Sequence, residues 1–234
     1  MLGGGTRLVA LVGKPVTGSL SPRMQNAAFA ARALDWAYVA LEVEPEALRK
    51  AVVGLVAGGY AGANVTIPHK QAVVELCDEA EGGSVNTLVF RDGRILGFNT
   101  DKEIVAGILG ERVCLIGAGG AAQALRAAFA AEVRVFSRRG DWPPDASSCD
   151  VVINATPVRD EVLVEPRAGQ TIVDLPYNAD GSPTALVAAA REAGAEVVDG
   201  LEALVRQGAA SFELWTGVSA PVDVMRRALG LEPT

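Results

Sequence analysis

The sequence predicts an α/β protein with two domains. Short apolar strand patterns alternate with helical patterns over the first hundred residues, and the same alternation starts again after Asp101. A glycine-rich loop, Gly117-Ala118-Gly119-Gly120, separates a strand pattern from a helix pattern in the second half. Such alternation favours parallel sheets wound with helices, and the glycine loop is typical of a Rossmann-like unit. We place the domain boundaries near residues 101 and 200.

The elements of the first domain follow from apolar periodicity. Strands are expected at 8–12, 38–43 and 61–65, and helices at 22–34 and 46–57. Ser21 is a candidate N-cap for the first helix, because its hydroxyl could accept a backbone N–H and Pro22 suits the first turn. Two more strands, at 88–90 and 94–98, flank Asp92-Gly93, which is a strong hairpin signal.

The second domain repeats the order of strand and helix. Strands are expected at 113–116, 133–136, 151–154, 171–175 and 196–198. Helices are expected from the glycine loop to about residue 130, at 184–193, at 202–215 and at 221–229.

Composition excludes several classes of protein. The chain has 234 residues, half of them apolar, and a formal net charge of −7. Negative charge argues against a nucleic-acid surface, and no apolar run approaches the roughly 18 residues of a membrane span. The first residues lack the pattern of a secretory signal. The three cysteines are isolated and there is one histidine, so we expect a reducing, cytosolic setting, no disulfide and no structural zinc.

The glycine loop and the strand after it indicate a dinucleotide site. Glycines let backbone N–H groups approach a pyrophosphate, and a helix N-terminus favours its charge. NAD-type sites usually carry an acidic residue about 20 positions on, where this chain has Ser137, Arg138 and Arg139. Guanidiniums would pair with a 2′-phosphate that an acid would repel, so the sequence favours NADP. The structural alternatives are a tight turn and two solvated arginines.

Two polar segments stand at strand ends of the first domain, where open α/β sheets bind ligands. Asn64-Val65-Thr66-Ile67-Pro68-His69-Lys70 ends one strand, and Asn99-Thr100-Asp101 follows the hairpin. We expect a helix holding Lys70, because Pro68 suits a first helical turn. Lys70 and Asp101 would make a proton-transfer pair if the fold brings them together, and the alternative is a structural ion pair.

These segments resemble those of shikimate dehydrogenases, enzymes of aromatic amino-acid biosynthesis. Further motifs match that family in order along almost the whole chain. They are Ser19-Leu20-Ser21, Ser84-Val85-Asn86-Thr87, Gly117-Ala118-Gly119-Gly120-Ala121-Ala122, Asn154-Ala155-Thr156-Pro157, Asp199-Gly200-Leu201 and Gln207-Gly208-Ala209-Ala210-Ser211-Phe212.

The resemblance implies reversible, NADPH-dependent reduction of 3-dehydroshikimate to shikimate. It implies an N-terminal α/β substrate-binding domain at 1–101, a Rossmann-like NADP-binding domain at 102–201, and C-terminal helices at 202–234 that return to the first domain. The catalytic residues would be Lys70 and Asp101. The substrate would contact Ser19, Ser21, Thr66, Asn86, Thr100, Tyr177 and Gln207. NADP would contact Gly117, Ala118, Gly119, Gly120, Ala121, Ser137, Arg138, Arg139, Thr156 and Gly200.

From these observations together we expect a cytoplasmic protein that binds a small-molecule substrate and neither nucleic acid nor a membrane. The sequence does not distinguish a monomer from a homodimer. The chain departs from the family where Ala203 replaces a methionine near the nicotinamide, and where the stretch 78–83 is short. His69 adjoins Lys70, and neighbours on a helix point about 100° apart, so we expect His69 to have a positional role.

Three alternatives stay open. One is a quinate/shikimate dehydrogenase with relaxed substrate or NAD preference, which Arg138 and Arg139 argue against only for NAD. Another is a non-catalytic dinucleotide-sensing protein on the same fold, which the presence of Lys70 and Asp101 disfavours. The third is an enzyme of similar layout such as a methylene-tetrahydrofolate dehydrogenase, which the paired serines and the segment 207–212 disfavour.

Overall fold

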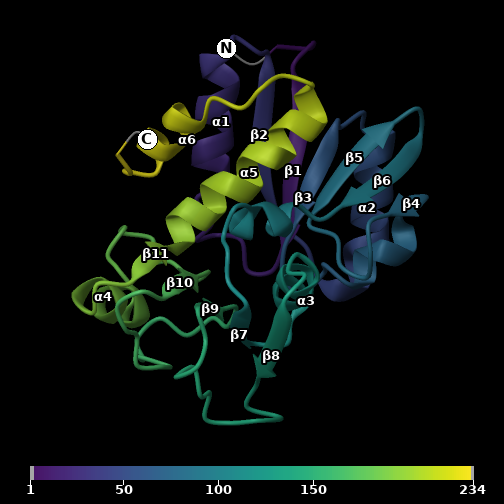
Figure 1. Ribbon diagram of the computed structural model, residues 1–234. Helices are drawn as coiled ribbons and strands as arrows, with labels where there is room; N and C mark the ends of the chain where they lie inside the picture. Colours follow the sequence, from purple (N-terminus) through teal and green to yellow (C-terminus); the bar gives the residue numbers. More distant parts are fainter. Residues whose placement is uncertain (1–2, 233–234) are drawn as a thin grey trace. The chain divides into compact units, whose positions relative to one another are not determined.

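The computed structural model describes residues 3–232, which form two compact units (Figure 1). Unit 1 contains the chain up to Thr100 together with the segment from Val205 onward, and unit 2 runs from Asp101 to Leu204. The outermost residues of the predicted first domain, 1–2 and 233–234, lie outside the described part of the chain.

Unit 1 is built on a six-stranded mixed sheet with the order β2-β1-β3-β5-β6-β4. The central strand β1 pairs in parallel with β2 and β3, and β5 runs antiparallel to β3 and β6. The strands are β1 (Arg7–Gly13), β2 (Trp36–Glu42), β3 (Gly62–Val65), β4 (Glu79–Ala80), β5 (Thr87–Arg91) and β6 (Arg94–Phe98). The two-residue strand β4 is absent from the sequence prediction, because two residues are too few for a periodic signal.

Helices cover both faces of this sheet. The helix α2 (Leu48–Ala57), preceded by the 3-10 turn η1 (Pro45–Ala47), packs on a core that includes Val12, Val65 and Leu88. The opposite face receives α1 (Ser21–Ala31) and the last part of α5 (Gly200–Thr216), whose rings of Phe29 and Phe212 stack at 5.3 Å. Successive residues of a strand face opposite sides of the sheet, and the central strands β1 and β3 are buried on both faces.

The C-terminal helices pack on the first half of the chain. The helix α6 (Val222–Ala228) contacts α1, and Gln25 Nε2 of α1 donates a hydrogen bond of 2.8 Å to the Gly208 carbonyl of α5. A Cβ at Gly208 would lie 2.3 Å from Met24 Cε, so glycine permits this close packing of the two helices.

Unit 2 contains a five-stranded parallel sheet with the order β11-β10-β9-β7-β8. Its strands are β7 (Arg112–Ile116), β8 (Glu132–Phe136), β9 (Val151–Asn154), β10 (Thr171–Asp174) and β11 (Glu196–Val198). The helices α3 (Gly120–Ala127) and α4 (Ala185–Glu192) pack against the cores on its two faces, and the 3-10 turn η3 (Thr100–Val105) adds Ile104 and Val105 to the α3 side. The chain leaves β7 toward β8 and then crosses back to β9, which makes the carboxyl ends of β7 and β9 a topological switch point.

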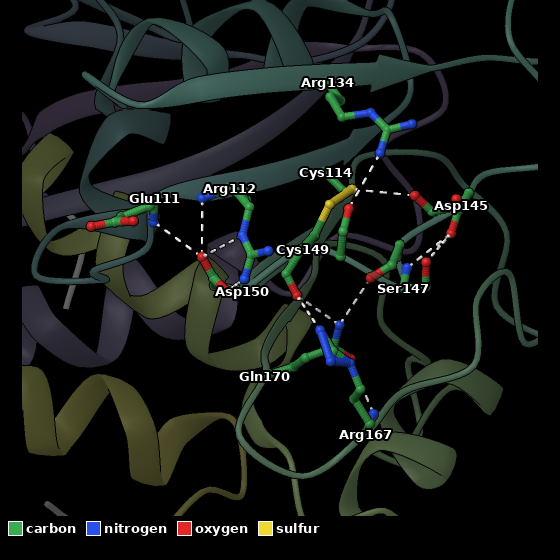
Figure 2. The surroundings of a disulfide bond; sticks show 12 residues. Glu111, Arg112, Cys114, Arg134, Asp145, Ser147, Cys149, Asp150, Arg167 and Gln170 are labelled. Carbon is green, nitrogen blue, oxygen red and sulfur yellow. Dashed lines mark hydrogen bonds and ion pairs between the residues drawn. A yellow bond between two sulfur atoms is a disulfide. The ribbon is translucent and has the colours of Figure 1, made fainter.

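The expectation that the cysteines stay unpaired is wrong for two of them. Cys114 in β7 and Cys149 before β9 form a disulfide with a Cα–Cα distance of 6.0 Å, and both side chains are fully buried (Figure 2). The two cysteines are 35 residues apart, so the sequence carries no signal of this disulfide. The hydrogen-bonded pairing of β7 with β9 brings them together. Cys77 remains a thiol, and burial, aided by Asp78, raises its pKa to about 11.

The predicted helix holding Lys70 is also wrong. The Ile67–Pro68 peptide is cis, and His69 N–H donates to the Thr66 carbonyl at 2.9 Å, which closes a turn. Lys70 therefore lies in a loop, and the next helical segment is the 3-10 turn η2 (Ala72–Leu76).

Gly62 on β3 allows Trp215 of α5 to reach the sheet. A Cβ there would lie 2.3 Å from the Leu88 carbonyl and 2.5 Å from Trp215 Nε1, which donates to that carbonyl at 2.9 Å. We expect Gly62→Ala to lower the free energy of unfolding by roughly 1–3 kcal/mol, measured by urea denaturation.

Gly54→Ala is the matched control. Gly54 lies within α2 and a Cβ there would have no atom within 4 Å, so this variant should gain roughly 0.5–1 kcal/mol from helix propensity. Equal effects of the two substitutions would contradict the packing role of Gly62.

Candidate active site

A buried hydrogen-bonded network occupies the strand ends of unit 1. Its members are Tyr38 of β2, Asn64 of β3, Asn86, Thr87, Thr100 and Ser211 of α5, each less than one tenth exposed. A buried polar group without a partner is costly, so the network fixes the conformation of its members.

Asn86 and Thr100, both predicted to contact substrate, are joined directly. The backbone N–H of Thr100 donates to Asn86 Oδ1 at 2.8 Å, and the Thr100 and Thr87 hydroxyls donate to the same oxygen at 3.1 and 2.9 Å. A backbone N–H can only donate, so the oxygen end of the Asn86 amide is assigned without ambiguity. Its Nδ2 consequently lies at the opposite end of the group.

Asn64 links three segments of the chain. Its Nδ2 is within hydrogen-bond distance of the Asn86 carbonyl (3.1 Å), Thr87 Oγ1 (3.0 Å) and Ser211 Oγ (3.0 Å). Its Oδ1 accepts from the Tyr38 hydroxyl at 2.8 Å. The first residue of the Asn64–Lys70 motif therefore joins β2, β5 and α5.

Tyr38 is itself held by Asn26 of α1. The Asn26 amide accepts from the Tyr38 N–H at 2.8 Å and donates to the Tyr38 carbonyl at 2.9 Å. The Tyr38 N–H and carbonyl point away from the sheet because β2 is an edge strand, and Asn26 forms the hydrogen bonds that a neighbouring strand would otherwise make. These bonds fix the backbone that carries the Tyr38 ring toward Asn64.

The loop that carries Lys70 is anchored on both sides. Thr66 N–H donates to the Val12 carbonyl at 2.9 Å, and the Lys70 carbonyl accepts from Val85 N–H at 2.8 Å. His69 is buried and its Nε2 lies 2.8 Å from the Val43 carbonyl, which favours the positional role inferred from the sequence. The Lys70 side chain is half-buried.

The start of α1 differs from the prediction that Ser21 caps it. Ser21 is the first residue of α1 and does not cap it, since the N-cap position is Leu20 without a side-chain hydrogen bond. Ser19 Oγ instead accepts from the Ser21 N–H at 3.2 Å. The helix end thus gains its acceptor from Ser19, and the capping prediction for Ser21 is wrong.

Gln207 is connected to the network through the helix that carries it. Ser211, one turn further along α5, donates to the Gln207 carbonyl at 3.1 Å and lies 2.9 Å from Thr87 Oγ1 and 3.2 Å from Thr100 Oγ1. No individual role was expected from the sequence for Tyr38, Asn64, Thr87 or Ser211. Asn64 and Ser211 could have been found from their places in two recognised motifs, whereas nothing in the sequence marks Tyr38.

In unit 2 the glycine loop lies at the topological switch point. Gly117 has φ +123°, which favours glycine, and a Cβ there would lie 3.0 Å from the Ala155 carbonyl after β9. Gly119 faces open space, and Gly120 begins α3. An open glycine loop at a helix N-terminus fits a dinucleotide phosphate.

The segment after β8 forms a turn that exposes its arginines. The Gly140 N–H donates to the Ser137 carbonyl at 2.9 Å, and Arg138 lies 3.4 Å from Glu161 Oε2 and over the Trp142 ring at 5.4 Å. Both partners of the ion pair are more than half exposed, so it contributes little to stability, and a phosphate could replace Glu161. Arg139 is exposed beside it.

The loops after β9 and β10 carry the other predicted contacts of unit 2. Thr156 donates from both N–H and hydroxyl to Asn154 Oδ1, at 2.9 and 2.7 Å. Tyr177 is half-buried after β10. Gly200 is buried, and a Cβ there would lie 2.4 Å from the Pro176 carbonyl, so glycine lets α5 begin against this loop.

Lys70 belongs to unit 1, and Asp101, which is buried, is the first residue of unit 2. Their action as a pair therefore stays a prediction.

Between residues 3 and 232 no helix is long and apolar enough to cross a membrane. In the same range no group of three or more acidic, histidine or cysteine side chains could hold a metal ion.

The Tyr38 hydroxyl donates a hydrogen bond to the Oδ1 atom of the buried Asn64 amide. We expect Tyr38→Phe to lower the free energy of unfolding by about 1–3 kcal/mol, because Asn64 Oδ1 loses its donor. Urea denaturation with Tyr60→Phe as control measures this, since Tyr60 is a partly buried ring packed against the α2 core. Indistinguishable stabilities of the two variants would contradict the assigned hydrogen bond.

Comparison with known proteins identifies the family. Residues 11–88 match the model of the shikimate dehydrogenase substrate binding domain, and residues 200–229 match that of the shikimate 5′-dehydrogenase C-terminal domain. A relative named shikimate dehydrogenase (NADP(+)) from Methanopyrus kandleri is 39% identical, and the match covers 96% of this chain and 95% of the relative.

Solved structures agree with the fold. A crystal structure of a shikimate dehydrogenase in complex with NADP+ superposes with a TM-score of 0.88 at 31% identity, covering 98% of this chain and 96% of the other. The shikimate 5-dehydrogenase of Thermus thermophilus, in complex with NADP(H) and shikimate, gives 0.82 at 30% identity, covering 96% and 99%. The two-domain α/β fold with a Rossmann-like unit is thereby confirmed, and the chain belongs to the shikimate dehydrogenase family.

Proposed function

We propose that this protein is an NADP-dependent oxidoreductase that reversibly reduces 3-dehydroshikimate to shikimate, a step of aromatic amino-acid biosynthesis. The observation that carries the proposal is the buried network of unit 1, which fixes Asn86 and Thr100 next to the anchored loop of Lys70. The relative named shikimate dehydrogenase (NADP(+)) supports it, as do the two similar crystal structures, one in complex with NADP+ and the other with NADP(H) and shikimate.

The substrate is a small ring with one carboxylate and several oxygens. Ser19 and Ser21 at the start of α1 offer neutral donors to the carboxylate, and the helix N-terminus favours its charge. Asn86 Nδ2, the end of the amide opposite its three donors, is assigned to a ring oxygen. Thr66, Thr100, Tyr177 and Gln207 complete the proposed set.

NADP is assigned to unit 2. The loop 117–121 would receive the pyrophosphate, and Thr156 and Gly200 would border the cofactor. Ser137, Arg138 and Arg139 would receive the 2′-phosphate, with Arg138 exchanging Glu161 for a doubly charged and stronger acceptor. A chain of net charge −7 needs such local cationic contacts to hold an anionic cofactor.

Bound NADPH supplies the hydride for the carbonyl carbon of the substrate. The oxygen of that carbonyl then carries negative charge, and we assign its proton and its electrostatic stabilisation to the Lys70 ammonium. Asp101 would orient Lys70 and accept a hydrogen bond from the substrate. The fixed backbone of Thr66 and Lys70 limits the freedom of the acid.

We accordingly assign 1–101 with 202–234 as the substrate-binding domain and 102–201 as the NADP-binding domain. We assign the protein to the cytoplasm, as a monomer or a homodimer.

An activity assay with the purified protein tests the proposed function. We expect shikimate to reduce NADP much faster than quinate does, and much faster than shikimate reduces NAD. Comparable rates with quinate or NAD would instead indicate a relaxed quinate/shikimate dehydrogenase, and NADP binding without turnover would indicate a dinucleotide sensor.

Lys70→Ala should separate catalysis from cofactor binding. We expect kcat to fall by roughly 10²–10⁴-fold, because the acid is lost, while the Kd of NADP stays unchanged. Lys50→Ala, an exposed lysine of α2, is the control and should leave both values unchanged. A parallel loss of turnover and NADP binding would mean that Lys70 is structural.

Arg138→Ala should alter cofactor preference. The KM of NADP is expected to rise roughly 10- to 100-fold, since a charge-assisted contact to the 2′-phosphate is lost, while the KM of NAD changes little. Steady-state kinetics with both cofactors give the ratio, and Arg126→Ala, an exposed arginine in the last turn of α3, serves as control. An unchanged NADP/NAD ratio would remove Arg138 from the phosphate site.

A further inference from the structure

A fully buried carboxylate lies at the carboxyl end of β10, outside the residues assigned to the reaction. Asp174 is 0% exposed, and Asn154 Nδ2 donates to its Oδ1 at 2.7 Å. The Thr184 hydroxyl donates to Oδ2. Within residues 3–232 no lysine or arginine forms an ion pair with it, which is unusual for a buried charge.

Asp174 and the Thr156 N–H together fix how the Asn154 amide is turned. A carboxylate can only accept, so Asn154 must direct its Nδ2 toward Asp174. Its Oδ1 then faces the next turn, where it accepts from the Thr156 N–H at 2.9 Å and from the Thr156 hydroxyl at 2.7 Å. The hydroxyl in turn accepts from Val158 N–H at 3.3 Å. Asn154 Nδ2 also lies 3.4 Å from the Val158 carbonyl, so the turn at 154–158 is held by its own hydrogen bonds together with the one to the carboxylate on the neighbouring strand.

The other oxygen of Asp174 ties a second loop. Thr184 is the N-cap of α4, where its hydroxyl accepts from Val187 N–H at 3.2 Å while it donates to Asp174. One carboxylate therefore holds the end of β9, the end of β10 and the start of α4. The turn at 154–158 also contains Ala155, whose carbonyl lies against Gly117 of the glycine loop.

We propose that Asp174 is a positioning residue for the dinucleotide: its ionised carboxylate holds Asn154, and through it the Thr156 turn, in the shape that receives NADP. This inference rests on the proposed function. Asp174 touches neither cofactor nor substrate in it, and acts by orienting a neutral amide.

The charge of Asp174 is poorly stabilised by its surroundings. Burial, opposed by the hydrogen bonds from Thr184 and Asn154 and aided by Asp199, raises its pKa to about 6. Asp199 is the charged group that faces it from the β11–α5 junction, and Arg191 of α4 pairs with Asp199 at 2.8 Å. Protonation would exchange the charge-assisted bond to Asn154 for a neutral one of about half the strength.

The direction of the pH effect follows. Above the Asp174 pKa the carboxylate is ionised, and its contribution to NADP affinity is fully present. The affinity falls as the pH drops through that pKa. A phosphate monoester also titrates near pH ~6, so the 2′-phosphate would add its own loss. The informative quantity is therefore the ratio of NADP Kd values between variant and wild type at each pH, in which the cofactor's own titration cancels.

Asp174→Asn removes the charge and keeps the size. We expect its NADP Kd to be about fivefold to tenfold above the wild-type value near pH ~8, and the ratio to approach one near pH ~5, where wild-type Asp174 is neutral. Asp145→Asn, an exposed aspartate of unit 2, is the matched control and should keep the ratio at one throughout. A ratio of one at every pH for Asp174→Asn, in a wild type that binds NADP, would overturn the inference and leave the proposed function intact. Absence of NADP binding by the wild type would instead remove the proposed function.

Thr184→Val provides a second test if Asp174→Asn does not fold. It keeps the carboxylate and removes a hydrogen bond that lowers its pKa, so the pH at which NADP affinity falls should move upward relative to wild type. Loss of helix capping alone would weaken α4 without moving that pH. An unchanged midpoint would therefore also overturn the positioning role.

Discussion

The structure of unit 1 depends on the need to satisfy one buried amide, that of Asn64 at the end of β3. Donors and acceptors around it come from β2, from the start of β5 and from α5. Removing the Tyr38 hydroxyl would take away the donor to Asn64 Oδ1, and a buried polar atom that loses its partner costs more than a typical hydrogen bond contributes. Asn64 therefore holds together the edge strand β2, the strands β3 and β5, and the helix α5, which is more than one hundred residues away in the sequence. The proposed substrate contacts Asn86 and Thr100 belong to the same network.

Unit 2 uses the same principle with a charged group. Asp174 has a place like that of Asn64 in unit 1, since both lie near the carboxyl end of a strand and both form hydrogen bonds to other segments of the chain. The difference lies in the cost. A neutral amide with matched partners has no pH dependence, whereas a buried carboxylate without a cationic partner is stabilised only by hydrogen bonds and is sensitive to protonation.

Glycines set how closely the backbone segments approach at both proposed sites. Gly117 permits contact with the loop after β9, and Gly200 permits α5 to begin against the loop after β10. Gly62 and Gly208 allow α5 to lie against the sheet and against α1. At Gly62, Gly117 and Gly200 a side chain would meet backbone or ring atoms, whereas at Gly208 it would meet the flexible end of the Met24 side chain.

The sequence by itself determined the fold class, nearly every strand and helix, and the order of the motifs, because apolar periodicity and glycine-rich turns are local signals. It also located Asn86, Thr100 and the glycine loop. The structure decided what these signals do not reveal: the disulfide of Cys114 and Cys149, the loop rather than helix at Lys70, and the hydrogen bond from the Ser21 N–H to Ser19 at the start of α1. Tyr38 and Asp174 became visible only there, since the hydrogen bonds that define them join residues 20 to 26 positions apart.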